Sequence, residues 1–252
     1  MAVGVGCAGQ TDHRRGELVF GNNLGVRNVQ VARELSRRLQ LPVGVENDVN
    51  AIGLGEACFG AARGARDLIA VFVGTGIGGG SVRDGAVVRG KSGAAAEVGH
   101  AISVPDGRAC NCGQRGCYEA YCSGRAFEEI GRELMAAGEW PAEAGERLTS
   151  AGLRVAARRS QLAADHLRRA EEAIAYLGAN LVTLLDPEVL VLGGGVVLHD
   201  RAFVGAVKSG IARHATLVAR RDVRVELTAL GEDAALLGAA AIGFEVLTKN
   251  GK

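Results

Sequence analysis

Short apolar runs along this chain alternate with segments whose apolar residues recur every three or four positions. Four such runs predict buried strands at residues 2–8, 43–45, 68–73 and 189–192, and the last three are bounded on both sides by glycine, proline or charged residues. A fifth strand is expected at residues 222–227, where polar and apolar residues alternate. Because helical segments separate these strands, the order of elements predicts an α/β fold.

Helical periodicity is clearest in two segments, each of which ends at an X-Pro pair. These segments are residues 27–40 and residues 167–184, and the proline after each one cannot continue a helix. A further helix is expected over residues 49–59. Asp233 is placed to cap a last helix that is rich in alanine and glycine.

The region between residues 81 and 124 is expected to hold a hairpin and a long loop. An Asp84-Gly85 pair favours a two-residue turn, so residues 81–88 predict a β-hairpin. Residues 90–124 show no clear periodicity and contain three closely spaced cysteines. We therefore expect residues 90–124 to form a loop-like segment that holds the cysteine cluster.

Glycine is the unusual feature of the composition, with 38 of 252 residues against only 4 prolines. No collagen-like or low-complexity pattern accounts for the glycines, so they are expected at turns, at close helix contacts and where backbone meets a ligand. The 29 Lys and Arg residues balance 28 Asp and Glu residues, which leaves no global attraction to nucleic acid or to a membrane surface. Neither a spanning segment nor a signal peptide is recognisable, and a cytoplasmic location is expected.

A glycine-rich segment, Gly74-Thr75-Gly76-Ile77-Gly78-Gly79-Gly80, follows the predicted strand 68–73. Its first, third and sixth residues fit the dinucleotide fingerprint G-x-G-x-x-G, and Glu97 follows at a suitable distance. That fingerprint requires a helix to begin in the glycine loop, whereas a hairpin is expected here. Backbone N–H groups of a glycine loop between strands can still bind phosphate oxygens. We expect a phosphate-binding loop rather than a nicotinamide site, with a plain glycine turn as the structural alternative.

Four side chains between residues 100 and 117 have the chemistry of a zinc site. His100, Cys110, Cys112 and Cys117 offer one imidazole and three thiolates, enough to complete a tetrahedral coordination shell. Four protein ligands leave no open position, so this zinc would be structural. Cys122 is a rival ligand, and three reduced cysteines in a loop are the alternative to a metal site.

The segment Glu46-Asn47-Asp48 lies between a predicted strand and a predicted helix, where α/β proteins often place functional loops. Taken alone, Asp48 would be interpreted as a helix cap. Glu97, His100 and Glu119 flank the cysteine-containing loop, however, and the whole set is rich in hydrogen-bonding groups suited to a polyol. Within such a site a carboxylate can take a hydroxyl proton as general base.

Four motifs in this order resemble the ROK family of bacterial sugar kinases and sugar-responsive repressors. They are Glu-Asn-Asp-Val-Asn at 46–50, Gly-Thr-Gly-Ile-Gly-Gly-Gly at 74–80, Glu-Val-Gly-His at 97–100 and Cys-x-Cys-Gly-x-x-Gly-Cys-x-Glu at 110–119. The resemblance extends over nearly the whole chain. It implies an actin-like ATPase (ribonuclease H-like) fold of two domains. The implied activity is ATP-dependent phosphorylation of a hexose, with glucose favoured, at its primary hydroxyl.

The resemblance also implies roles for individual residues. Asp48 would be the catalytic base. Sugar contacts would be Asn23, Asn47, Glu97, His100 and Glu119, and structural Zn²⁺ would be held by His100, Cys110, Cys112 and Cys117. ATP, used with Mg²⁺, would contact Gly74, Thr75, Gly76, Gly78, Gly79, Gly193, Gly194 and Gly195.

One part of the family pattern is absent from this sequence. Family members begin with a strand and a phosphate-binding Asp-x-Gly-Gly-Thr hairpin whose aspartate is linked to magnesium, and the repressors carry a helix-turn-helix before it. We therefore expect a truncated first domain, residues 1–52 with the C-terminal helix 236–252 packed on it. Residues 53–235 would form a large domain with the zinc loop and the nucleotide loops. Phosphorylation is expected to be impaired in such a chain, while sugar binding is retained.

Three alternatives to a kinase stay open at this point. The chain would be the sugar-sensing core of a ROK transcriptional regulator, a catalytically inactive sugar-binding protein or, most distantly, a nicotinamide oxidoreductase. For the kinase, the expected partners are a hexose and ATP, with no membrane and no nucleic acid. A homo-oligomer, dimer or tetramer, is also expected.

Overall fold

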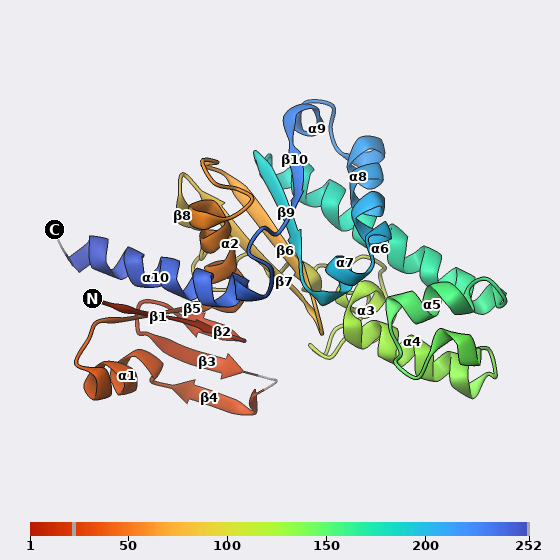
Figure 1. The fold of residues 1–252 in the computed structure, drawn as a ribbon, viewed down its shortest axis with the longest axis horizontal. Coiled ribbons are helices and arrows are strands. Elements are labelled where there is room, and N and C mark those ends of the chain that lie inside the picture. Colours follow the sequence, from red (N-terminus) through yellow and green to blue (C-terminus); the bar gives the residue numbers. More distant parts are fainter. Residues whose placement is uncertain (22–23, 251–252) are drawn as a thin grey trace.

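The computed structural model describes residues 1–21 and 24–250 as three β-sheets with helices packed around them (Figure 1). The largest sheet has five strands in the order β10–β9–β6–β7–β8. Its strands are β6 (Leu68–Val73), β7 (Ile77–Arg83), β8 (Ala86–Val87), β9 (Val189–Gly193) and β10 (Arg224–Leu227). Strands β6, β9 and β10 run parallel, whereas β7 is antiparallel to both of its neighbours.

Two smaller sheets occupy the N-terminal part of the chain. Their strands are β1 (Val3–Cys7), β2 (Gln10–Asp12), β3 (Glu17–Gly21), β4 (Val26–Val29) and β5 (Val43–Asn47). Strands β2, β3 and β4 form an antiparallel sheet, and helix α1 (Val31–Leu39) leads from it to β5. Strand β1 pairs in parallel with β5, and this register sets Cys7 opposite Asn47. The chain that follows β1 therefore lies beside the start of the Asn47-Asp48 segment.

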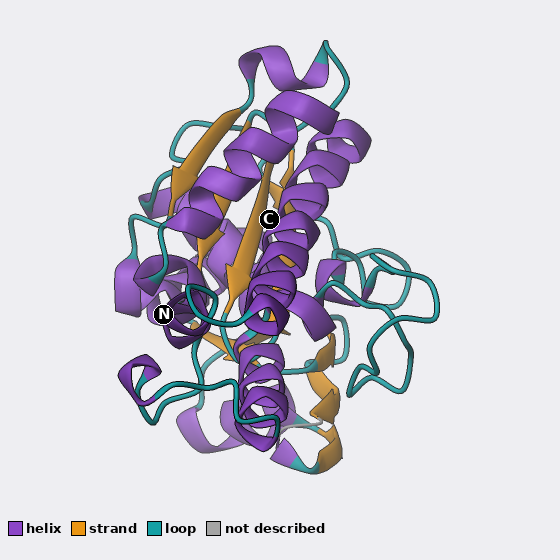
Figure 2. Ribbon diagram, turned by 90° about the vertical axis from the view of Figure 1, so that its right-hand side faces the viewer, coloured by secondary structure: helices purple, strands orange, loops and turns teal. Residues whose placement is uncertain are grey.

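Helices cover both faces of the five-stranded sheet (Figures 1 and 2). They are α2 (Asp48–Phe59), α3 (Glu119–Cys122), α4 (Gly124–Ala136), α5 (Ser150–Ala156), α6 (Gln161–Leu185), α7 (Gly195–His199), α8 (Ala202–His214), α9 (Ala219–Asp222) and α10 (Ala234–Asn250). Short 3₁₀ turns lie at Val98–His100, Ala142–Ala144 and Gly231–Asp233. Helices α6 and α8 pack together on one face, and α2 packs on the opposite face against β6 and β7. Among the described residues, no helix combines the length and the apolar character needed to cross a bilayer.

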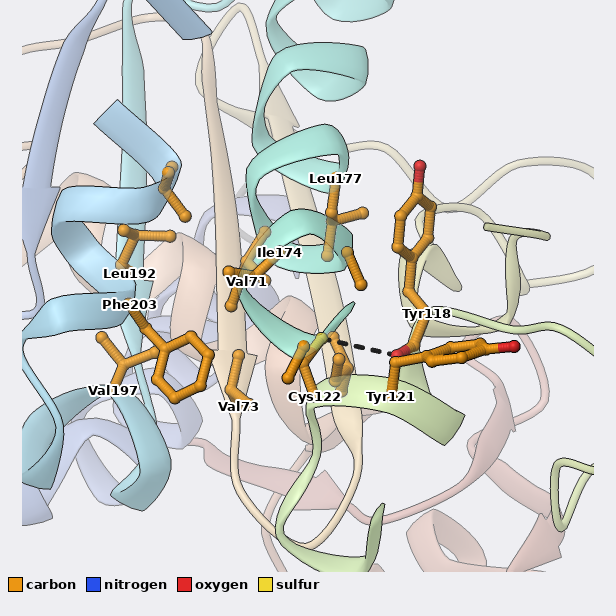
Figure 3. Close-up of a cluster of buried hydrophobic side chains, with 14 of the residues drawn as sticks. Val71, Val73, Tyr118, Tyr121, Cys122, Ile174, Leu177, Leu192, Val197 and Phe203 are labelled. Atoms are coloured by element: carbon orange, nitrogen blue, oxygen red, sulfur yellow. Dashed lines mark hydrogen bonds between the residues drawn. The ribbon is translucent and has the colours of Figure 1, made fainter. Parts of the chain in front are cut away.

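The main core lies between the five-stranded sheet and α6 (Figure 3). Val71 of β6 and Ile174 of α6 are fully buried members of this core. Tyr118, Tyr121 and Cys122 enter the same core immediately after the cysteine cluster, and Cys122 Sγ donates to the Tyr118 carbonyl oxygen at 3.4 Å. The loop with the candidate metal ligands is thus anchored to the main core at its C-terminal end.

The C-terminal helix α10 returns to the N-terminal part of the chain and packs against β1 and α2. Glycines allow this close approach. A Cβ on Gly4 would lie 1.8 Å from the Ala239 carbonyl oxygen, and a Cβ on Gly238 would lie 2.6 Å from the backbone of Ala51. The domain boundary expected after residue 52 falls inside α2, and the division into two domains stays a prediction.

Most of the elements expected from the sequence pattern are confirmed, with small shifts at their ends. The hairpin is confirmed in detail, because Asp84 and Gly85 have φ angles of 51° and 74°, as a type I′ turn requires. The helix expected over residues 27–40 is wrong at its start. Its first residues belong to β4, where Val29 pairs opposite Leu18, so α1 begins only at residue 31.

Candidate functional site

A cleft of about 720 Å³ lies where the N-terminal strands meet the turn between β6 and β7. The candidate residues that line it are Asn47, Asp48, Gly74, Thr75, Gly76, Gly78, Gly79, Glu97, His100, Cys112, Glu119 and Gly194. These groups come from distant parts of the sequence, and the fold brings them into one site. Asn23, a further predicted sugar contact, lies outside the described residues.

Asn47, and not Asp48, is the N-cap of α2. Asn47 Oδ1 accepts the backbone N–H of Val49 at 3.0 Å and that of Asn50 at 3.1 Å. Asn47 Nδ2 donates to the Gly9 carbonyl oxygen at 3.1 Å, which ties this segment to the turn after β1. The interpretation of Asp48 as a helix cap is therefore wrong, and its carboxylate is available on the cleft wall.

The Asp48 carboxylate is half-buried at the first residue of α2. Its Oδ1 accepts the backbone N–H of Val49 at 2.9 Å. Burial raises the pKa of Asp48 above its ordinary value, and hydrogen bonds from the backbone and from Asn47 oppose the shift only in part. A carboxylate with a raised pKa is a stronger proton acceptor, which is the property that a general base needs.

Glu97 lies close enough to two other cleft carboxylates to feel their charge. Part of its side chain reaches solvent, yet desolvation in the cleft raises the pKa of Glu97. His100 opposes this shift, whereas Asp48 and Glu119 add to it. A cleft that gathers carboxylates in this way favours a ligand that supplies hydroxyl donors.

The segment Gly74-Thr75-Gly76 forms the turn between β6 and β7. The N–H of Gly74 donates to the carbonyl oxygen of Gly76 at 2.9 Å, and Thr75 is exposed. Glu119 Oε2 accepts the N–H of Ile77 at 2.8 Å, and a Cβ on Gly76 would lie 2.4 Å from that oxygen. Glycine at position 76 therefore makes room for the buried carboxylate.

Gly78, Gly79 and Gly80 lie in β7 and not in the loop expected from the sequence. A Cβ on Gly78 would lie 2.4 Å from Val49 Cγ2, and one on Gly79 would lie 2.3 Å from the Ala96 carbonyl oxygen. These glycines let the start of α2 and the segment before Glu97 approach β7, and so they place both carboxylates on the cleft. Because the turn leads directly into β7, no helix begins between residues 74 and 83, and the nicotinamide fingerprint is not fulfilled.

The second glycine segment, Gly193 to Gly195, joins β9 to α7. Gly193 packs under an aromatic side chain, since a Cβ there would lie 2.4 Å from the Phe72 ring. Gly194 has a φ of 86°, and a Cβ on it would lie 2.4 Å from the Val73 carbonyl oxygen. Of these three glycines, Gly194 alone lines the cleft.

The four candidate zinc ligands gather beside the cleft. One ligand atom from each of His100, Cys110, Cys112 and Cys117 lies within 4.8 Å of all the others. The distance from Cys110 Sγ to His100 Nδ1 is 3.7 Å, and the distance between the Cys112 and Cys117 sulfurs is also 3.7 Å. Tetrahedral Zn²⁺, with Zn–S bonds of about 2.3 Å, sets neighbouring ligand atoms roughly 3.5–3.8 Å apart. Both the donor set and the spacing therefore fit zinc.

His100 belongs to both the candidate zinc-ligand cluster and the cleft. Its Nδ1 is the nitrogen near Cys110, and its side chain also lines the cleft, so Nε2 remains for another partner. Cys122, the rival ligand, is fully buried and donates to the Tyr118 carbonyl oxygen instead. Cys122 is therefore not a member of the cluster formed by the described residues.

Several residues that line the cleft were not identified from the sequence, among them Gln10, Phe20 and Arg125. A local signal exists for Arg125, because the preceding Ser123 is a typical N-cap residue. That signal predicts a helix start but does not reveal that the helix begins against the Gly74 turn. Only the tertiary contact brings Arg125 to the site.

Comparisons with known proteins cover nearly all of the chain. Residues 1–245 match the ROK family. A glucokinase from Streptomyces coelicolor is 34% identical over 258 residues, which cover 97% of this chain and 80% of that protein. A ROK family glucokinase from Streptomyces griseus, solved in complex with glucose and AMPPNP, has a TM-score of 0.80 at 34% identity and covers 97% of this chain and 81% of its own. The xylose repressor of Caldicellulosiruptor bescii is 28% identical over 249 residues, 96% of this chain and 62% of the repressor.

Proposed function

This chain belongs to the ROK family, and on that premise we propose that it catalyses ATP-dependent phosphorylation of a hexose, with glucose favoured, at the primary hydroxyl. It has the actin-like ATPase fold. The observation that carries the proposal is the single cleft that combines Asp48, the four predicted sugar-binding side chains Asn47, Glu97, His100 and Glu119, and the Gly74-Thr75-Gly76 turn. Phosphoryl transfer needs little more from a protein than such positioning and charge stabilisation.

Asp48 acts as the general base. It takes the proton of the primary hydroxyl while that oxygen forms a bond to the γ-phosphorus of ATP. The bond from this phosphorus to the β,γ-bridging oxygen breaks, and ADP leaves. Because Asn47 caps α2, the Asp48 carboxylate is not needed for that purpose. Its raised pKa also suits the transfer.

Sugar hydroxyls are held by Asn47, Glu97, His100 and Glu119. Asn47 Nδ2 has one N–H left after its bond to Gly9, and Glu119 Oε1 is the oxygen that Ile77 does not occupy. Carboxylates accept hydrogen bonds from hydroxyls, whereas the asparagine N–H donates to hydroxyl oxygens. The set therefore supplies both kinds of partner to a polyol.

Structural Zn²⁺ would be held by His100, Cys110, Cys112 and Cys117. A metal with four protein ligands has no open position for water, so it fixes structure and does not take part in the transfer. It would hold the loop that precedes Glu119 against the 3₁₀ turn that carries His100. Two predicted sugar contacts would then share one rigid support.

ATP is proposed to lie with its phosphates against the Gly74-Thr75-Gly76 turn and its adenosine toward Gly194. Both segments line the cleft, which supports this orientation. Mg²⁺ bound to the triphosphate would neutralise charge on the phosphate oxygens. The contacts of Gly193 and Gly195 with ATP stay predictions.

Formation of ADP in the presence of glucose tests the proposal. A coupled assay would compare glucose, mannose, N-acetylglucosamine and no sugar, with calorimetry measuring sugar affinity in parallel. Sugar-dependent ADP formation is expected, at the reduced rate that the sequence predicts. The relation to a xylose repressor supports a second candidate, the sugar-sensing core of a regulator. Sugar binding without ADP formation would contradict the kinase and favour that regulator or an inactive sugar-binding protein.

The cytoplasmic location and the homo-oligomer stay predictions.

A further inference from the structure

Arg125 is the one arginine that lines the cleft, within the part of the chain that the structure describes. It is half-buried at the second residue of α4. The same cleft is lined by three carboxylates, those of Asp48, Glu97 and Glu119. A cation here would ordinarily be expected to pair with one of them.

The Arg125 guanidinium has no hydrogen-bonding or ion-pair partner among the residues that the structure describes. Other half-buried arginines behave differently: Arg89 pairs with Glu46, Arg108 with Glu133, and Arg154 with Asp200. The contrast matters because a guanidinium withdrawn from bulk water is costly unless its N–H groups find acceptors.

The backbone of Arg125 is fixed against the Gly74-Thr75-Gly76 turn. The N–H of Gly124 donates to the Gly74 carbonyl oxygen at 2.8 Å, and the N–H of Arg125 donates to the Thr75 carbonyl oxygen at 3.1 Å. A Cβ on Gly124 would lie 2.8 Å from the Gly74 oxygen, so the two segments pack without a side chain between them. The fully buried Ser123 caps α4 through the Ala126 N–H at 3.1 Å and keeps this start in place.

We infer that the Arg125 guanidinium binds the terminal phosphate oxygens of the nucleoside triphosphate and stabilises the charge on the phosphoryl group during its transfer. The inference rests on the proposed kinase function. A planar guanidinium can donate two parallel hydrogen bonds to a phosphate, and no carboxylate among the described residues occupies those donors. The two backbone hydrogen bonds make Arg125 move together with the turn that is proposed to hold the phosphates.

Calorimetry with full-length protein separates a phosphate contact from a structural role. MgATP and adenosine would be titrated into the wild type, Arg125→Ala, Arg125→Lys and the control Arg132→Ala. Arg132 lies on the same helix, is mainly exposed and pairs with Glu128 at 3.2 Å. We expect Arg125→Ala to weaken MgATP binding by roughly 10- to 100-fold, in keeping with a charge-assisted hydrogen bond. Adenosine binding and the control are expected to change less than about twofold, since neither loses a phosphate contact.

Steady-state kinetics provide the second readout. Arg125→Ala is expected to lower kcat by about 10²- to 10³-fold with little change in the KM for glucose. Arg125→Lys should recover part of the loss, because lysine keeps the charge but not the planar fork. An Arg125→Ala protein that binds MgATP and turns over like the wild type would overturn the inference, and so would equal losses for MgATP and adenosine. Wild-type protein that binds no MgATP and forms no ADP would instead overturn the proposed function itself.

Discussion

The backbone N–H of Ile77 donates a 2.8 Å hydrogen bond to Oε2 of Glu119, a buried carboxylate 42 positions further along the chain. This bond joins the turn between β6 and β7 to the short helix that follows the cysteine cluster. A proposed phosphate-binding turn and a proposed sugar-binding loop are thereby held together. A disturbance of either residue should affect both parts of the site.

Gly76→Ala tests this contact through stability. The new Cβ would lie 2.4 Å from Glu119 Oε2, so the carboxylate or the turn must move. We expect the free energy of unfolding to fall by about 1–3 kcal/mol, in the range of overpacked sites. Gly74→Ala is the matched control, because a Cβ there meets no atom within 4 Å. Urea denaturation of both variants would measure the difference, and equal stabilities would contradict the proposed role of the Ile77–Glu119 contact.

Asp48→Asn tests the general base. The substitution keeps the size of the side chain but removes its ability to take a proton, so kcat should fall by about 10²- to 10⁴-fold while glucose affinity is retained. Asp84→Asn, at the exposed hairpin turn, is a suitable control because asparagine tolerates the positive φ at that position. Near-normal turnover in Asp48→Asn would rule out the assignment.

The pH dependence of kcat/KM should report the raised pKa of Asp48. The base must be ionised to act, so activity is lost as the pH falls through its folded-state pKa. Because burial raises that pKa above the ordinary 3.8, the acid limb should begin at a higher pH than for a solvent-exposed aspartate. A profile that stays flat down to the ordinary value would speak against a buried base, provided that the coupling enzymes are shown to remain active.

Removal of zinc should loosen the cysteine loop and the sugar site together. We expect about one zinc per chain, its loss in Cys112→Ser, a fall in Tm of roughly 5 °C or more, and weaker glucose binding. Cys58→Ser is the matched control, since Cys58 is an exposed free cysteine outside the cluster. Elemental analysis without zinc, together with a Tm that does not respond to chelators, would contradict the site.

The sequence alone predicted those features whose conformation depends on residues close together in the chain. The Asp84-Gly85 turn needs only a backbone that accepts positive φ, and strands β6 and β9 follow from continuous apolar runs that must be buried. The four motifs likewise predicted the ROK family and its actin-like fold, and both predictions are confirmed. The spacing of the cysteines predicted that they gather with His100, and they do, because three of the four side chains lie close together in sequence; zinc binding stays a prediction.

Tertiary structure decided the features that depend on partners distant in sequence. Val26–Val29 became strand β4 because Leu18 supplied a pairing partner that helical periodicity cannot reveal. Asn47 became the cap of α2, and not Asp48, because Gly9 holds its amide in place. Arg125 reached the cleft through backbone bonds to the Gly74 turn, although nothing in its own segment marks it as a ligand-binding residue. Hydrophobic periodicity and turn residues predict conformations that neighbouring residues determine. The direction in which a polar side chain points depends instead on the distant backbone segment against which it packs.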